Sequence, residues 1–241
     1  MNGEGGEAKE VGPLLKGLNW VYDKALEGVA GWESAEEFAK NYTDAYPSRE
    51  KAIDGLIAWQ MSKAAVAGFV TGLGGILVLP VAIPANLASV LFIQLRMIAG
   101  IAHIRGYDLK SDQVRSLAFM CLAGSAATDV AKDVGINIGA KLTASAISKI
   151  SGETLKKINQ AVGFRLVTKA GTTGAVNLGR LIPFVGGLLS GAIDAVTTRT
   201  MGSTAKSVFR RKRSRQTGAA QKRARVPKRP TRSRPKKRKS E

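Results

Sequence analysis

The chain has 241 residues and a formal net charge of +19, concentrated at one end. From Lys206 onward lie 17 of the 37 Lys and Arg residues and one of the 18 acids, so this tail carries +16 and the rest +3. A single cysteine, Cys121, excludes an internal disulfide framework and fits a reducing compartment.

The first residues predict a short leader followed by helices. Residues 1–12 are acidic and glycine-rich without the basic and apolar regions of a signal peptide, so we expect a disordered leader and no cleaved signal. Residues 13–49 form an N-terminal helical segment, with apolar residues at helical spacing after Pro13 and a second helix capped by Ser34. Ser48 is expected to cap the next helix, opened by Arg49.

An apolar stretch of 32 uncharged residues, Ala64–Leu95, dominates the middle of the chain. A spanning helix needs about 20 apolar residues, but Pro80 and Pro84 interrupt this stretch. We therefore predict an apolar hairpin of two helices, and the pattern leaves open whether lipid or a protein core surrounds it. Its two arms are at the lower edge of spanning length, which favours peripheral or partial insertion over a full span.

Further helices follow the hairpin. Pro84 starts one that ends at Gly106, and others are expected at about 111–134, 136–150, 153–170 and 184–208, with a structured loop at 171–183. No segment alternates like a strand, so the fold class is all-α: a compact multi-helix bundle built around hairpins broken by glycine and proline. Small residues repeat every fourth position at Ala64, Gly68 and Gly72, and again at Gly187, Gly191 and Ala195, which favours close helix packing.

Three segments, at 72–109, 114–124 and 158–202, resemble the EcsC protein family. The last follows the ordered pattern INxxxGFRLxTKxGxxGxxNLGxxxPxxGGxxxGxxDAxxTR, although Ala170 replaces an aromatic residue found in many relatives. The resemblance covers most of residues 50–209, which we treat as an EcsC-like helical domain. It implies a helical domain and a bacterial source, and it implies no reaction.

No catalytic, metal or cofactor site is expected. The only histidine, His103, and Cys121 would have to meet in space to form a nucleophilic pair, and Cys121 lies in an apolar run typical of a core. One His and one Cys with scattered acids do not make a metal site, and the glycines near Gly72 match no phosphate-binding loop.

Several polar residues stand in apolar surroundings, and a buried charge needs a partner. They form either an internal network that fixes the packing of the helices or a polar site for a lipid headgroup or other ligand. The candidates are Gln94, Arg96, Asn159, Arg165, Arg180 and Asp194.

The tail, residues 210–241, is low in complexity and interrupted by prolines, so we predict a disordered polybasic segment. It could attach to an anionic membrane surface or bind nucleic acid without sequence preference, or it could keep the protein in solution. Phe209 is the one aromatic residue from Lys206 onward, so the tail offers no aromatic side chains on which bases could stack. The residues expected to contact the membrane or polyanion are Arg210, Arg211, Lys212, Arg213, Arg215, Lys222, Arg223, Arg225, Lys228, Arg229, Lys236, Lys237, Arg238 and Lys239.

Two functions follow from these patterns. The first is a non-enzymatic protein attached to the cytoplasmic face of the membrane through apolar helices and the polybasic tail. The second is a soluble helical interaction module whose tail binds nucleic acid or another polyanion. Protein partners and the biological process stay open.

Overall fold

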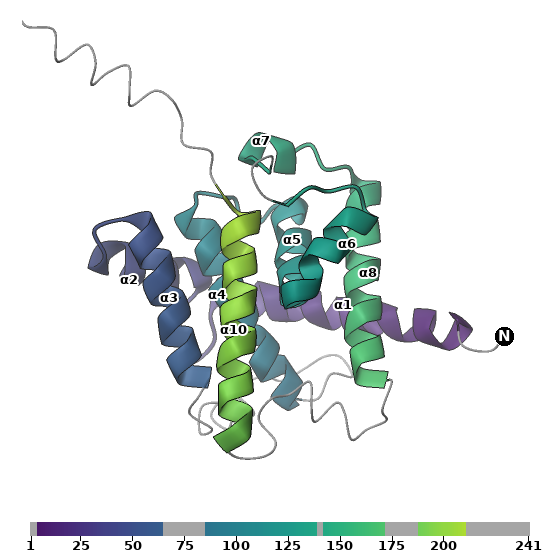
Figure 1. Cartoon of the computed structure of the whole chain (residues 1–241), viewed down its shortest axis with the longest axis horizontal. Helices are drawn as coiled ribbons and strands as arrows, with labels where there is room; N and C mark the ends of the chain where they lie inside the picture. The colour runs from purple at the N-terminus through teal and green to yellow at the C-terminus, as the bar shows by residue number, and fades with distance from the viewer. Residues whose placement is uncertain (1–3, 65–84, 139–141, 172–187, 211–241) are drawn as a thin grey trace, which may run out of the picture. The chain divides into compact units, whose positions relative to one another are not determined.

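The computed structural model describes residues 4–64, 85–138, 142–171 and 188–210, and its side chains are described for most of these (Figure 1). Within these ranges the secondary structure is helical except for an isolated bridge between Val29 and Trp32. The all-α prediction is therefore confirmed. The helices are α1 (Glu4–Glu27), α2 (Ala35–Ala45), α3 (Arg49–Ala64), α4 (Ala85–Ile104), α5 (Asp112–Leu122), η1 (Gly124–Ala126), α6 (Ala127–Asp133), α7 (Ala144–Ile147), α8 (Gly152–Gly171) and α10 (Leu188–Val208).

Helix α4 is the central element of the bundle, because α1, α2, α3, α5 and α10 all pack against it. Its side chains Phe92, Leu95 and Ile98 are completely buried. Residues 88–92 and 95 of the apolar stretch thus lie in a protein core. The proposed joint at Pro80 and Pro84 lies outside the described residues, and so do the small-residue rows apart from Ala64, Gly191 and Ala195.

Several predicted helix boundaries are confirmed. Ser34 forms a capping box with Glu37 at the start of α2, and the Ser48 hydroxyl accepts a hydrogen bond of 3.3 Å from the Lys51 amide. Ser111 caps α5, and Gly106 follows α4 with a positive φ of 81°.

Three predicted boundaries need correction. Helix α1 begins at Glu4, inside the predicted leader, where Glu7, Ala8 and Lys9 are good helix formers. Its next turn is held by packing, because Val11 lies against α8. The predicted helix 111–134 is divided into α5, η1 and α6.

The division occurs at Gly124, whose φ of +59° lies outside the helical region. Its carbonyl accepts a hydrogen bond of 3.2 Å from the Thr204 hydroxyl on α10. A side chain of a distant helix therefore replaces the backbone amide that would donate to this carbonyl in a continuous helix.

The predicted helix 136–150 is reduced to Ala144–Ile147. Gly135 ends α6 with a φ of 74°, and the Ile136 amide donates back to the Ala131 carbonyl at 2.7 Å. Ile138 and Leu142 then pack on the core from chain that is not helical, because burial outweighs their helical spacing.

One end of the bundle collects four helix termini. Helices α3 and α8 end there, at Ala64 and Gly171, and α4 and α10 begin there, at Ala85 and Leu188, all toward the lower side of Figure 1. We call this side the apolar end. Helix α10 rises about 31 Å from it, so Arg210 lies near the opposite end. Among the helices that are described, none is long and apolar enough to cross a membrane.

Candidate functional site

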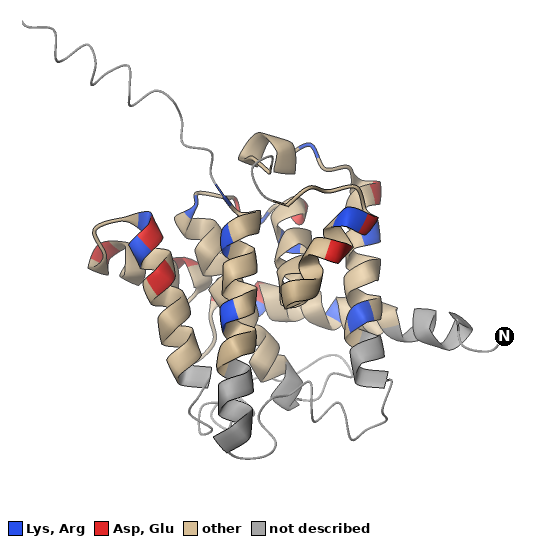
Figure 2. Ribbon diagram, in the orientation of Figure 1, with Lys and Arg blue, Asp and Glu red and all other residues tan. Residues whose placement is uncertain are grey.

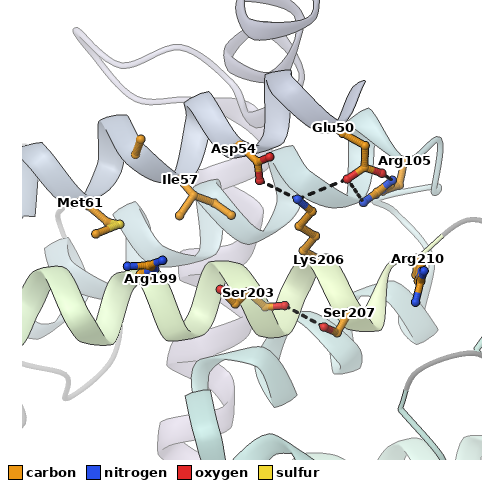
Figure 3. Close-up of a pocket in the computed structure, with 11 residues that line it drawn as sticks. Glu50, Asp54, Ile57, Met61, Arg105, Arg199, Ser203, Lys206, Ser207 and Arg210 are labelled. Atoms are coloured by element: carbon orange, nitrogen blue, oxygen red, sulfur yellow. Dashed lines mark hydrogen bonds and ion pairs between the residues drawn. The ribbon is translucent and has the colours of Figure 1, made fainter. Parts of the chain in front are cut away.

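A pocket of about 670 Å³ lies between α3 and α10, which we call the α3–α10 groove (Figure 3). Its lining contains two acids and four basic residues. From α3 come Glu50, Asp54, Ile57, Ala58 and Met61, from α10 come Arg199, Ser203, Lys206 and Ser207, and Arg105 and Arg210 complete it.

An ion-pair network crosses the groove, and we call it the latch. Both guanidinium NH₂ groups of Arg105 donate to the Glu50 carboxylate, one of them at 3.1 Å. The Lys206 ammonium lies 2.6 Å from an Asp54 oxygen and 3.3 Å from a Glu50 oxygen. The latch therefore joins α3, α10 and the residue after α4, and Figure 3 shows these contacts as dashed lines.

The latch shifts the titration of its members. Hydrogen bonding from Arg105 holds the pKa of the Glu50 carboxyl below its ordinary value, against the opposing effect of partial burial. The hydrogen bond to Asp54 raises the pKa of the Lys206 ammonium. Both charged forms are stabilised by their partners, so the latch is ionised near neutral pH.

A glycine allows α3 and α10 to approach closely. A Cβ atom added at Gly202 would lie 2.8 Å from Cγ1 of Ile57. Gly202 lies outside the small-residue row that the sequence singles out on this helix.

Two cations of the groove lie outside the latch. Arg199 and Arg210 are exposed, and no ion pair to either occurs among the described side chains. Ser203 lies one turn after Arg199 on the same face of α10, and Ser207 lies one turn before Arg210. Figure 3 places Arg199 at the Met61 side of the groove and Arg210 at the Arg105 side.

The proposed polar network can be followed in part. Arg96 is buried, and its guanidinium carbon lies 4.3 Å from the centroid of the Phe38 ring and 4.7 Å from that of Trp32. It also donates to the Glu33 carbonyl at 3.2 Å. Desolvation lowers the pKa of Arg96 to about 10. Its described surroundings are therefore aromatic rings and a backbone oxygen.

The other members of this set have different surroundings. Arg165 pairs with Asp133 of α6 at 3.2 Å, and Gln94 is half-buried on α4. Asn159 lies on α8, and its buried Oδ1 has no hydrogen-bond partner in the described ranges. Arg180 and the Asp194 side chain lie outside the described residues, so a network through Asp194 stays a prediction.

The tail residues are represented by Arg210 alone, which is exposed and whose carbonyl accepts a long hydrogen bond of 3.5 Å from the Tyr107 hydroxyl. The remaining predicted contacts, Arg211–Lys239, lie outside the described residues.

The candidate nucleophile does not suit catalysis. Cys121 is completely buried in α5, and burial raises the pKa of its thiol far above the ordinary value, so it stays protonated. His103 lies half-buried on α4 beside a second pocket of about 610 Å³, with Tyr46 and Arg49 among its lining. The described portion of the chain contains no group of three or more His, Cys, Asp or Glu able to hold a metal ion.

The apolar end exposes large side chains that the sequence does not single out. Trp59 of α3 is 50% exposed, Phe164 of α8 is 48% exposed and Val196 of α10 is 65% exposed. At 1.5 Å per residue, all three lie within about 12 Å of the helix termini at this end. Figure 2 shows the same helices with their acidic and basic residues coloured.

Comparison with known proteins identifies the family of the chain. The chain matches the EcsC protein family over residues 14–213, which includes the N-terminal helical segment and the groove. No curated protein and no solved structure shows significant similarity to it. Because the family match covers most of the chain, the protein belongs to the EcsC protein family.

Proposed function

We propose that the protein is a non-enzymatic, peripheral membrane protein whose apolar end contacts the anionic cytoplasmic face. The observation that carries this proposal is that three exposed apolar side chains, Trp59, Phe164 and Val196, lie on the helix portions next to the end of the bundle where four helix termini meet. Scattered exposed apolar side chains are ordinary, but a set at one end is typical of an interaction surface.

The energetics favour such a contact. A half-exposed aromatic side chain has about 100 Å² left to bury, and inserting it gives roughly 2–3 kcal/mol. Trp59 and Phe164 together therefore support weak, reversible binding. Such partial insertion needs no spanning helix.

The charge of this end supports an anionic surface. In sequence, the helix segments nearest the apolar end carry Lys63 and Lys169 against one acid, Asp194, while Arg165 is paired with Asp133. Each basic residue near an anionic membrane contributes about 1 kcal/mol. The buried, protonated thiol of Cys121 supports the non-enzymatic part of the proposal.

Vesicle flotation tests the proposal. The double variant Trp59→Ser with Phe164→Ser should lose about tenfold or more in affinity for anionic vesicles, because two apolar contacts are removed. Tyr46→Ser is the matched control, since Tyr46 is an exposed aromatic residue, at 39%, just before the start of α3 and so at the end of that helix opposite to Ala64.

One outcome of the flotation experiment would contradict the proposal. Equal binding by the double variant and the wild type, with both proteins folded by circular dichroism, would show that the apolar end is not the contact surface.

A second candidate function is polyanion binding by the tail. It is favoured by the position of Arg210 near the end opposite to the apolar end, which lets the tail engage a separate partner. Full-length protein should then bind DNA with a steep salt dependence, and a chain ending at Arg210 should not. Salt-independent DNA binding, or unchanged binding after truncation, would contradict this function.

A further inference from the structure

The α3–α10 groove has an apolar part and a charged part. Ile57, Ala58 and Met61 line the portion toward the apolar end, together with Arg199. Glu50 and Arg105 lie toward the other side. Because Arg199 stands beside these apolar side chains, this portion of the groove suits an amphiphile, with apolar atoms along α3 and an anionic group at Arg199.

The charges leave a positive surplus in the groove. Lys206 and Arg105 neutralise Asp54 and Glu50 within the latch. Arg199 and Arg210 remain, which gives the lining a net charge of +2 that matches a dianionic phosphate monoester.

The position on α10 selects Arg199 over Arg210 as the main contact. The negative pole of the helix dipole acts within the last turn, next to Arg210, and disfavours an anion there. Arg199 and Ser203 lie in the middle of α10, where this effect is small, and offer a guanidinium and a hydroxyl on one face.

The height of Arg199 suits a membrane headgroup. Arg199 lies about 16 Å along α10 from Leu188 at the apolar end. If the apolar end enters the headgroup and acyl boundary by about 5–10 Å, Arg199 stands near the outer headgroup layer. This step rests on the proposed function.

We propose that the α3–α10 groove binds the phosphate monoester headgroup of a membrane lipid, with Arg199 and Ser203 as the contacts and Ile57 and Met61 beside its apolar part. The groove then adds lipid selectivity to the general attraction between basic residues and the membrane surface, which is common to all anionic lipids.

The test compares two vesicle types with the full-length protein. Phosphatidylcholine vesicles contain either phosphatidate, a monoester, or phosphatidylglycerol, a diester, at fractions matched for surface charge. Wild type should bind the monoester vesicles several-fold more tightly. Arg199→Gln should lose about tenfold on monoester vesicles only, because a charge-assisted hydrogen bond is removed.

Two further variants distinguish a specific contact made by Arg199 from a general effect of the net charge of the protein. Lys156→Gln removes one charge from an exposed position on α8 that does not line the groove, and should bind like wild type. Arg199→Lys keeps the charge without the bidentate geometry and should fall between wild type and Arg199→Gln.

A soluble probe separates this proposal from the membrane proposal. Glycerol 3-phosphate carries the same monoester without acyl chains, and calorimetry should show weak binding to wild type that Arg199→Gln abolishes. If this holds while no vesicle binds, the phosphate site stands and membrane attachment is wrong. If Arg199→Gln and Lys156→Gln behave alike in both assays, or if wild type shows no monoester preference and no glycerol 3-phosphate binding, the groove proposal is wrong.

Discussion

Arg96 is a buried cation whose described contacts are the faces of Phe38 and Trp32 and the Glu33 carbonyl. The sequence marks Arg96 as unusual because it follows a long uncharged stretch. It could not identify the partners, because they lie about 60 positions earlier and the recognition of a cation by ring faces leaves no spacing pattern. The sequence therefore identifies Arg96 as an unusual residue but does not reveal that aromatic rings surround it.

Substitutions at Arg96 should rank by how well they fit an aromatic cage. Arg96→Lys should lower the free energy of unfolding by about 2 kcal/mol, because the planar group that stacks on both rings is lost. Arg96→Met should cost less, since replacing a buried charge by an apolar side chain of similar length removes desolvation. Urea unfolding at pH 7 measures both, and the opposite order would favour an ion pair such as the predicted one with Asp194.

Glu50 and Lys206 confer a pH dependence on stability. The folded pKa of Glu50 is depressed, so its contribution is present above its ordinary value of 4.5 and is lost as pH falls through the folded pKa. The folded pKa of Lys206 is raised, so its contribution is present below 10.5 and is lost as pH rises through the folded pKa. The latch therefore stabilises the fold most between about pH 5 and 10.

Glu50→Gln should reduce the free energy of unfolding by about 1–2 kcal/mol at pH 7. This value lies between those typical of exposed and of buried ion pairs, because Glu50 is half-exposed and Arg105 is buried. The difference from wild type should shrink as pH falls from 4.5 through the depressed folded pKa of Glu50, because the unfolded carboxyl protonates first. Chemical unfolding at pH 7 and pH 3 checks this, and an equal difference at both values would contradict it.

At the scale of the helices, boundaries set by local chemistry were predictable and boundaries set by distant packing were not. The caps at Ser34 and Ser48 follow from side chains three residues from their backbone partners. The break at Gly124 depends on Thr204, 80 positions away. The groove likewise needs α3 and α10 side by side, which no pattern along the chain specifies.

Gly202 should be intolerant of a methyl group. Gly202→Ala gains helix propensity of about 1 kcal/mol but forces Ile57 away, and overpacking of about 1–3 kcal/mol should make the variant less stable. Gly12→Ala is the matched control, because a Cβ at this α1 position meets nothing within 4 Å and should stabilise. Thermal unfolding compares the two, and a more stable Gly202→Ala protein would refute the close packing of α3 and α10.

The molecule as a whole has a sharp boundary before its tail. Phe209 is completely buried, and its ring centroid lies 5.3 Å from that of Tyr107, whereas Arg210 is exposed. The compact unit ends at Arg211, while the family match continues to residue 213. The fold therefore uses Phe209, one residue before the predicted tail.

Truncation should expose this boundary. A chain ending at Arg210 should unfold at nearly the same temperature as the full-length protein, because the tail contributes no described core residue. A chain ending at Val208 should lose about 3–5 kcal/mol, the cost of removing a buried Phe side chain. Calorimetry distinguishes the two, and equal stabilities would show that Phe209 is dispensable.

The exposed Trp59 also gives the protein an optical reporter. The chain has three tryptophans, and Trp20 and Trp32 are both half-buried and pack against the core, Trp32 with Arg96 and Phe92 beside its ring. Trp59 is the one at the apolar end. Contact of that end with lipid would shift the emission of Trp59 to shorter wavelengths and leave that of Trp20 and Trp32 unchanged, so unlabelled protein would reveal by its fluorescence which side faces the bilayer.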